Sequence, residues 1–266
     1  MKTIEQKLNN NSYFKGFVQT VPGPREQKTF PTIVIVPGGG YKKIPIQQTE
    51  AIANAFYNQG FNAIYLRYSI TGEVSSIYPN ALVELAQTIK SLKNNSDWPI
   101  DDRIFIAGFS AGGQIVSLFN DYWKAQWLND AAQTTATDIE PTAIILGYPV
   151  ISPLLGYPND DAVVKSWISN ENVEKYAADL NVNQDNKPTF LWVTREDQVV
   201  PIINSISYIS ELNKNNIPLE FHIFNHGPHA LALANTMTAT KDQEKPYLPH
   251  VAHWFNLMME WIKDFI

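Results

Sequence analysis

Residues 102–113 read Asp-Arg-Ile-Phe-Ile-Ala-Gly-Phe-Ser-Ala-Gly-Gly and are the most informative stretch of the chain. Within it an apolar run ends in Gly108, Ser110 and Gly112 at alternate positions, and the sequence that follows, QIVSLFNDYW, is compatible with a helix. Glycines on both sides of a serine let a strand and a helix approach closely around a tight turn, because glycine has no Cβ. The pattern predicts a strand, a turn that exposes Ser110, and a helix, with Ser110 as a nucleophile.

The rest of the chain alternates apolar runs with amphipathic stretches. Six runs rich in Val, Ile, Phe and Tyr are predicted to be strands: 32–36, 61–67, 103–107, 142–146, 189–194 and 219–224. Five amphipathic stretches are predicted to be helices: those near 47–58, 79–93, 112–124, 201–215 and 248–265. Strands that are nearly continuously apolar and alternate with helices are typical of a mostly parallel, doubly wound sheet covered on both faces. The fold class is therefore predicted to be α/β, with a central sheet flanked by helices.

Two segments interrupt this alternation within what we expect to be a single domain of residues 1–266. Residues 1–31 contain Pro22-Gly23-Pro24 and Pro31, and leave room for one or two edge strands. Residues 148–187 are longer than a plain crossover needs and contain a polar stretch, NVNQDNKP. This second segment is either a lid or substrate-facing insertion, or a long crossover with an extra helix near 160–178.

Composition excludes several classes of protein. The chain has 266 residues, a net charge of −6 and no cluster of Lys and Arg, which argues against a nucleic-acid partner. It has no cysteine, so neither a thiol nucleophile nor a thiolate metal site is available. No apolar run approaches the length of a membrane span and no secretory signal is visible, so we expect a cytoplasmic protein without a membrane partner.

A serine hydroxyl needs a base to take its proton and a third group to hold that base. Asp197 follows the strand FLWVT, and His229 follows the next strand, FHIF. The carboxyl ends of parallel strands gather at one edge of the sheet, where residues far apart in sequence can meet. The order serine, acid, histidine is also that of the α/β-hydrolases. We therefore predict Ser110, Asp197 and His229 as the catalytic residues.

Competing residues exist for both partners. Glu196 adjoins Asp197, but one residue earlier it would point off the other side of the loop. His226 lies in the same loop as His229 and is its main rival as the base. His250 and His253 are one helical turn apart, but no further ligand set accompanies them, so no metal is expected.

The stretch Pro37-Gly38-Gly39-Gly40-Tyr41 follows the first predicted central strand. Glycines let a backbone turn its N–H groups toward a substrate, where they can stabilise a developing oxyanion. We predict that the N–H groups of Gly39, Gly40 and Ala111 form this oxyanion hole. A dinucleotide site is disfavoured because Lys43 stands where the third glycine of GxGxxG belongs, and no P-loop sequence is present.

With these motifs placed, the chain resembles bacterial α/β-hydrolases of the esterase/lipase type. It is especially similar to an acetyl-xylan-esterase-like branch related to hormone-sensitive-lipase and BD-FAE-like carboxylesterases. The stretches that carry the resemblance are 37–41, 98–113, 188–201 and 220–234. Two positions depart from the family pattern: Pro37 replaces the histidine that opens HGGG in the lipase branch, and Ala230 stands where glycine often follows the catalytic histidine.

The resemblance implies a serine carboxylesterase that needs no cofactor and acts on short acyl esters, often of acetylated sugars or xylan fragments. It assigns the nucleophile to Ser110, the acid to Asp197 and the base to His229. A peptidase or amidase of the same fold and a binding protein without catalysis remain as alternatives. The expected partner is a small-molecule ester, and a homo-oligomer is compatible with the sequence, which does not specify the oligomeric state.

Overall fold

The computed structural model describes residues 1–266 except for 10, 21–28, 169–171 and 243. Within the described residues, eight strands form one sheet in the order β1-β2-β4-β3-β5-β6-β7-β8. The strands are β1 (Lys2–Lys7), β2 (Tyr13–Val18), β3 (Phe30–Val36), β4 (Asn62–Arg67), β5 (Ile100–Phe109), β6 (Ala143–Gly147), β7 (Thr189–Thr194) and β8 (Leu219–Phe224). The helices are α1 (Ile46–Tyr57), α2 (Asn80–Asn94), α3 (Ala111–Tyr122), α4 (Gln126–Ala132), α5 (Ala136–Ile139), α6 (Asp161–Ile168), α7 (Ile203–Lys214) and α8 (Pro249–Trp261). Short 3₁₀ helices are η1 (Val173–Tyr176), η2 (Ala178–Leu180) and η3 (Ile262–Phe265).

The strand pairing is parallel from β4 to β8 and antiparallel at the amino-terminal edge. β1 pairs with β2, and β2 pairs with β4, in antiparallel register. Every other pair in the sheet is parallel. The predicted α/β fold is confirmed, and the segment before residue 31 supplies two strands, of which β1 forms the edge of the sheet and β2 lies next to it. The proline-glycine stretch at 22–24 lies outside the described residues.

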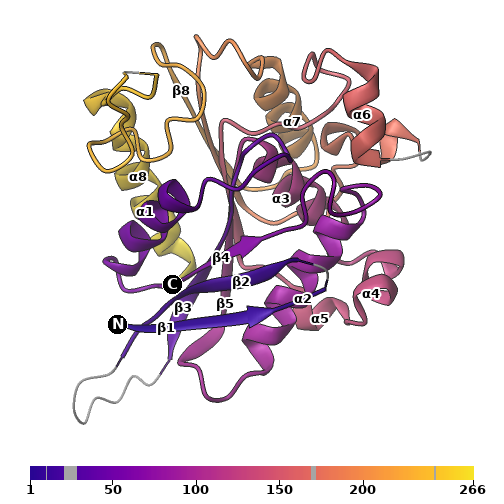
Figure 1. The fold of residues 1–266 in the computed structure, drawn as a ribbon, viewed down its shortest axis with the longest axis vertical. Coiled ribbons are helices and arrows are strands. Elements are labelled where there is room, and N and C mark those ends of the chain that lie inside the picture. Colours follow the sequence, from indigo (N-terminus) through magenta and orange to yellow (C-terminus); the bar gives the residue numbers. More distant parts are fainter. Residues whose placement is uncertain (10, 21–28, 169–171, 243) are drawn as a thin grey trace.

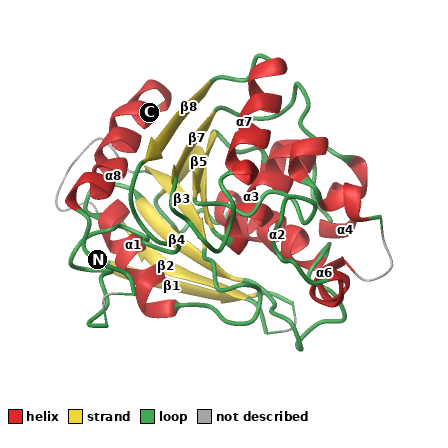
Figure 2. Ribbon diagram, turned by 90° about the horizontal axis from the view of Figure 1, so that it is seen from above, coloured by secondary structure: helices red, strands yellow, loops and turns green. Residues whose placement is uncertain are grey.

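Helices cover both faces of the sheet, and the alternation of side chains along the strands explains why. On β3, Ile33 and Ile35 pack in one buried cluster and Val34 and Val36 pack in the other, so both faces of this strand are apolar. α1 and α8 lie against one face, and α2, α3 and α7 lie against the opposite face (Figures 1 and 2). Burial on two sides accounts for the nearly continuous apolar runs that predicted these strands.

The sequence analysis did not predict two short helices, α4 and α5. α4 has seven residues and α5 has four, and they follow α3 before the chain enters β6. Elements this short complete too few turns to produce a clear helical repeat of apolar residues. α5 depends on a local capping box, in which the Thr135 hydroxyl accepts from the Asp138 N–H and the Asp138 side chain accepts from the Thr135 N–H.

The long segment 148–187 contains α6, η1 and η2 within its described part. Trp167 of α6 packs on Tyr41, with ring centroids 4.4 Å apart, and Tyr157 packs on Trp167 at 6.2 Å. The segment is thus seated on the loop that follows β3. Its role as a lid stays a prediction.

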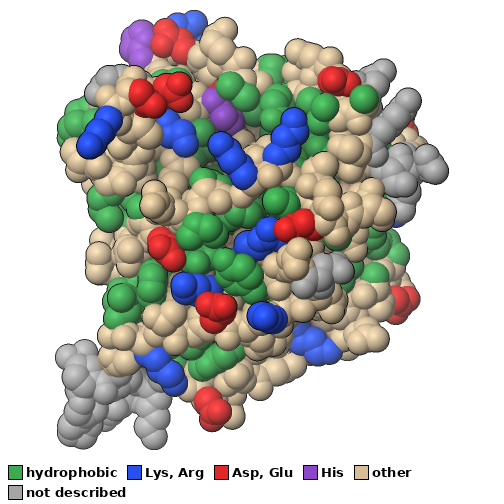
Figure 3. Space-filling view, viewed as in Figure 1, with side chains coloured by type: hydrophobic (Ala, Val, Ile, Leu, Met, Phe, Trp, Pro, Cys, Tyr) green, Lys and Arg blue, Asp and Glu red, His purple; other side chains and the backbone are tan. Residues whose placement is uncertain are grey.

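Charged and hydrophobic side chains are interspersed over the face seen in Figure 1 (Figure 3). Across the ranges that the structure describes, no helix combines the length and the apolar character that crossing a membrane requires.

Candidate active site

The turn between β5 and α3 holds Ser110 in a strained backbone conformation. β5 ends at Phe109, α3 begins at Ala111, and Ser110 between them has φ 54° and ψ −121°. A Cβ built on Gly108 would lie 2.6 Å from the carbonyl oxygen of Gly112, and one on Gly112 would lie 2.1 Å from the carbonyl oxygen of Val36. Both distances are impossible for real atoms, so the two glycines are steric requirements of this turn.

The structure brings Ser110, His229 and Asp197 together at the carboxyl ends of β5, β8 and β7. The Ser110 Oγ lies 2.7 Å from His229 Nε2, and His229 Nδ1 lies 2.6 Å from Asp197 Oδ2. An ionised carboxylate can only accept a hydrogen bond, so the Nδ1–H of His229 donates to Asp197. That tautomer leaves Nε2 free to accept the proton of the Ser110 hydroxyl.

Burial and backbone contacts fix the two partners of Ser110. The side chain of Asp197 is 0% exposed and that of His229 is 11% exposed. The other carboxylate oxygen of Asp197, Oδ1, accepts from the N–H groups of Val199 and Val200, both at 2.9 Å. The ring of Tyr148 meets the imidazole of His229 edge to face, with centroids 5.0 Å apart. These contacts leave the imidazole little freedom to turn away from Ser110.

The rival residues form a separate pair. His226 Nδ1 lies 3.0 Å from Glu196 Oε1, and their side chains are 71% and 43% exposed. The hydrogen bond from His226 lowers the pKa of the Glu196 carboxyl below its usual value. Neither side chain forms a hydrogen bond with Ser110 in the described part of the chain.

The glycine loop after β3 lies beside Ser110. A Cβ on Gly38 would come within 2.9 Å of Ser110 Cβ, whereas one on Gly40 would meet Tyr157 Oη at 3.5 Å. Gly39 and Gly40 have φ values of 117° and 61°. Among the described residues, their N–H groups have no hydrogen-bond partner in the protein. The assignment of these two groups to an oxyanion hole stays a prediction, as does that of Ala111, which opens α3 and has no intrahelical partner for its N–H.

Tyrosine hydroxyls connect the glycine loop to the start of α3 and to the segment that follows β4. The buried hydroxyl of Tyr41 lies 3.0 Å from the Ala111 carbonyl and 2.6 Å from Gln114 Oε1. The hydroxyl of Tyr68 donates to the carbonyl of Pro37 at 3.0 Å. Burial is the main cause that raises the pKa of Tyr41, and neighbouring tyrosines raise it further. The hydroxyl of Tyr41 therefore stays protonated. The sequence marked Tyr41 only as the end of a glycine motif and gave no sign of its partners.

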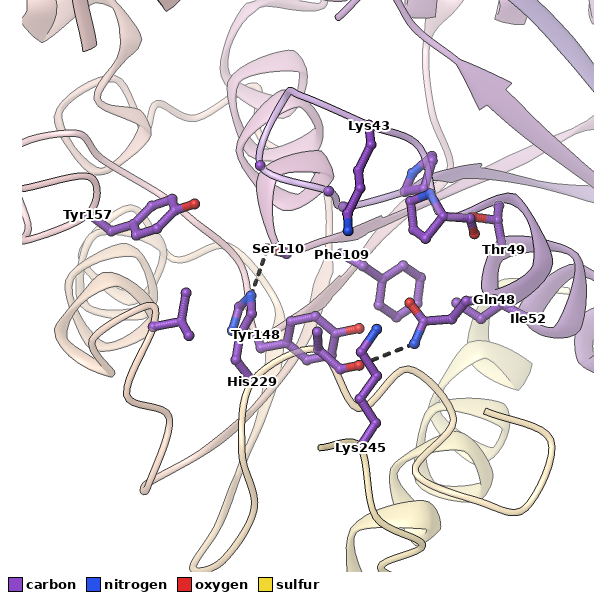
Figure 4. Close-up of a pocket in the computed structure, with 17 residues that line it drawn as sticks. Lys43, Gln48, Thr49, Ile52, Phe109, Ser110, Tyr148, Tyr157, His229 and Lys245 are labelled. Atoms are coloured by element: carbon purple, nitrogen blue, oxygen red, sulfur yellow. Dashed lines mark hydrogen bonds between the residues drawn. The ribbon is translucent and has the colours of Figure 1, made fainter. Parts of the chain in front are cut away.

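Ser110 and His229 open into a cavity of about 190 Å³ (Figure 4). Part of its wall is apolar and comes from Pro45, Ile52, Phe109, Tyr148 and Val199. Lys43, Gln48 and Lys245 also line it, and Gln48 Nε2 donates to the Ala230 carbonyl at 3.2 Å. Sequence reasoning missed these lining residues, because no motif connects positions so far apart in the chain.

Comparisons with known proteins identify a family and several similar structures. The family described as BD-FAE matches residues 21–212. A carboxylesterase from Lactobacillus plantarum superposes with a TM-score of 0.92 at 29% identity, covering 99% of this chain and 98% of that one. An acetyl ester-xyloside bifunctional hydrolase from Caldicellulosiruptor lactoaceticus superposes with a TM-score of 0.77 at 27% identity, covering 97% and 89%.

A curated relative is much longer than this chain. Endo-1,4-beta-xylanase B of Butyrivibrio fibrisolvens is 30% identical over 209 residues, which are 76% of this chain but 33% of the xylanase. The chain therefore spans about a third of the length of that relative.

Proposed function

Since the chain belongs to the BD-FAE family, we propose that it is a serine carboxylesterase that cleaves short acyl esters through an acyl-enzyme. The observation that carries this proposal is the continuous hydrogen-bonded series Ser110–His229–Asp197, of which Ser110 and His229 line a small cavity. Each member has the neighbour that its role requires, because a serine becomes nucleophilic only when an oriented base takes its proton.

In the acylation step, Ser110 Oγ attacks the ester carbonyl carbon while His229 Nε2 takes the hydroxyl proton. The carboxylate of Asp197 stabilises the imidazolium that forms, and it keeps the ring in the productive orientation. The N–H groups of Gly39, Gly40 and Ala111 would donate to the carbonyl oxygen as it gains negative charge. The tetrahedral intermediate then collapses, and His229 gives its proton to the departing alcohol.

In the deacylation step, water occupies the place that the alcohol has left. His229 takes a proton from the water, and the resulting hydroxide attacks the carbonyl carbon of the acyl-enzyme. Collapse of the second tetrahedral intermediate breaks the bond to Ser110 Oγ, which recovers its proton from His229. The products are a carboxylic acid and an alcohol. These two reaction steps use only groups of this chain and water.

We further propose that the acyl group is acetyl or similarly short and that the alcohol belongs to an acetylated sugar or xylan fragment. The small size of the cavity supports a short acyl group. The names of two similar proteins, an acetyl ester-xyloside hydrolase and a xylanase, support the sugar.

A panel of 4-nitrophenyl acetate, butyrate and octanoate, together with acetylated xylo-oligosaccharides, tests both halves of the substrate. We expect kcat/KM for acetate to exceed that for octanoate by at least about tenfold, because a cavity of about 190 Å³ that also receives the alcohol half leaves little room for added methylenes. A steady rise from acetate to octanoate would contradict the short-acyl proposal. Release of 4-nitroaniline from an aminoacyl anilide, without ester cleavage, would contradict the esterase itself and favour a peptidase.

A further inference from the structure

Two lysines that the catalytic mechanism does not use face the cavity. Lys43 follows the glycine loop and Lys245 precedes α8, so they come from opposite ends of the sequence. Both line the same cavity as Ser110 and His229, and Figure 4 shows their side chains directed into it from two sides. On the face seen in Figure 3, Lys or Arg side chains lie beside a histidine. The entrance to the candidate active site is therefore flanked by positive charge.

The ammonium groups of Lys43 and Lys245 form no close ion pair within the described residues. Burial, followed by repulsion from Lys43, lowers the pKa of Lys245, and these effects exceed the attraction of Glu244 and Asp242. Two like charges that face one cavity destabilise each other, and an anion between them would remove that repulsion.

Acidic side chains are absent from the described lining of the cavity, and Asp242 and Glu244, which attract Lys245, lie outside that lining. The other polar groups of the lining include Gln48, Thr49 and Tyr157. The whole chain has a net charge of −6, so the positive charge at this cavity is opposite in sign to the net charge of the protein. A cationic site on an acidic protein selects among anions by local contact, because the overall charge does not attract them.

We propose that Lys43 and Lys245 form a subsite for a carboxylate on the alcohol half of the ester substrate. This inference rests on the proposed function, in which the acyl half is as small as acetyl and has no place for a charge. The charge must then belong to the alcohol. The substrate class becomes short acyl esters of alcohols that carry a carboxylate.

The test compares two esters of nearly equal shape, 4-acetoxybenzoate and 4-acetoxybenzamide, which differ in the charge of the alcohol half. First, kcat/KM is measured for both at low ionic strength, each corrected for spontaneous hydrolysis. Second, the binding of both esters to Ser110→Ala is measured by calorimetry, which requires no catalysis. We expect the benzoate to be preferred over the benzamide by about fivefold in each measurement, and the preference to fall with added salt.

Variants assign the preference to the two lysines. In Lys43→Met/Lys245→Met the ratio of kcat/KM for benzoate over benzamide should fall to about one, because methionine keeps the length of lysine without its charge. Lys43→Arg/Lys245→Arg should retain a preference for the benzoate. Lys42→Met/Lys241→Met removes the same net charge from two exposed lysines that do not line the cavity, and its ratio should equal that of the native chain.

The outcomes separate this inference from the function on which it rests. Equal kcat/KM and equal binding of the two esters would overturn the carboxylate subsite, as would a preference that survives in Lys43→Met/Lys245→Met. Loss of the preference in Lys42→Met/Lys241→Met would also overturn it, because overall charge would then explain the effect. Tighter binding of the benzoate without turnover of either ester would contradict the esterase while supporting the subsite.

Discussion

Two histidine–carboxylate pairs lie side by side in the sequence and differ in almost every physical respect. Asp197 and His229 form one pair at 2.6 Å, with side chains 0% and 11% exposed. Glu196 and His226 form the other at 3.0 Å, with side chains 43% and 71% exposed. Both pairs join the loop after β7 to the loop after β8. The two pairs therefore have similar residue types and chain positions. They differ in the burial of their side chains and in the group that each histidine contacts next.

The comparison indicates that burial is what suits Asp197 and His229 for a catalytic role. A hydrogen-bonded pair in water exchanges its partners freely, whereas a buried pair keeps one geometry and acts through stronger electrostatic interactions. The buried pair also ends on Ser110 Oγ, while the exposed pair continues to Asn225, whose amide lies 2.7 Å from His226 Nε2. We expect Asp197 and His229 to determine kcat, and we expect Glu196 and His226 to form a surface contact with little effect on kcat.

Removal of the nucleophile should have the largest effect, since it removes the group on which the buried pair acts. Ser110→Ala should lower kcat by on the order of 10⁶ if the three residues act as a unit. The measurement is hydrolysis of 4-nitrophenyl acetate by purified, folded protein, with circular dichroism as the control for folding. Retention of a tenth of the native activity would end the assignment, as would failure of a fluorophosphonate to label Ser110.

Replacement of each histidine compares the two pairs directly. His229→Ala should lower kcat by at least about 10⁴, because the serine loses its base, whereas His226→Ala should change it by less than about tenfold. Both variants are assayed with the same ester under the same conditions. The reverse order of effects would transfer the role of base to the exposed pair and break the comparison.

Replacement of each carboxylate keeps shape and removes charge. Asp197→Asn should lower kcat by about 10⁴, since the amide no longer holds the required tautomer of His229. Glu196→Gln should change kcat by less than about threefold, as expected for a contact in solvent. The two neutral, nearly isosteric variants serve as controls for each other. Equal losses in both would show that the two loops work as one unit.

The smallest expected effect concerns Tyr41, which is as buried as Asp197 but does not touch Ser110. Tyr41→Phe removes a hydroxyl near the Ala111 carbonyl and Gln114, which should cost about 1–3 kcal/mol in the free energy of unfolding. Denaturant unfolding measures that loss. The matched variant Tyr68→Phe frees the Pro37 carbonyl and should also destabilise the protein. A loss of kcat in Tyr41→Phe as large as in Asp197→Asn would show that burial alone does not separate catalytic from supporting groups.

Much of the fold could be predicted, because strands buried on both faces carry apolar runs that can be seen in one sequence. Ser110 and the order of its partners could be predicted too, since the carboxyl ends of parallel strands converge. The prediction of His229 over His226 rested on the resemblance to the family, because residue types alone do not distinguish the two. The choice between the two histidines depends on how the loop turns at Gly227, with φ 140°, and Ala230, with φ 64°. The meeting of Lys43 with Lys245 depends on the paths of two loops, and no periodic pattern encodes them.

The backbone of Ser110, with φ 54° and ψ −121°, bears on any attempt to make this protein more heat-resistant. A residue with a Cβ in such a conformation costs about 1–3 kcal/mol, and glycine would avoid most of that cost. A redesign that corrected unfavourable dihedral angles would therefore select Ser110→Gly among its first changes. The resulting protein would be more stable to unfolding but would lack the proposed nucleophile. The strained backbone of Ser110 is therefore a feature that stability engineering must leave unchanged to keep the proposed nucleophile.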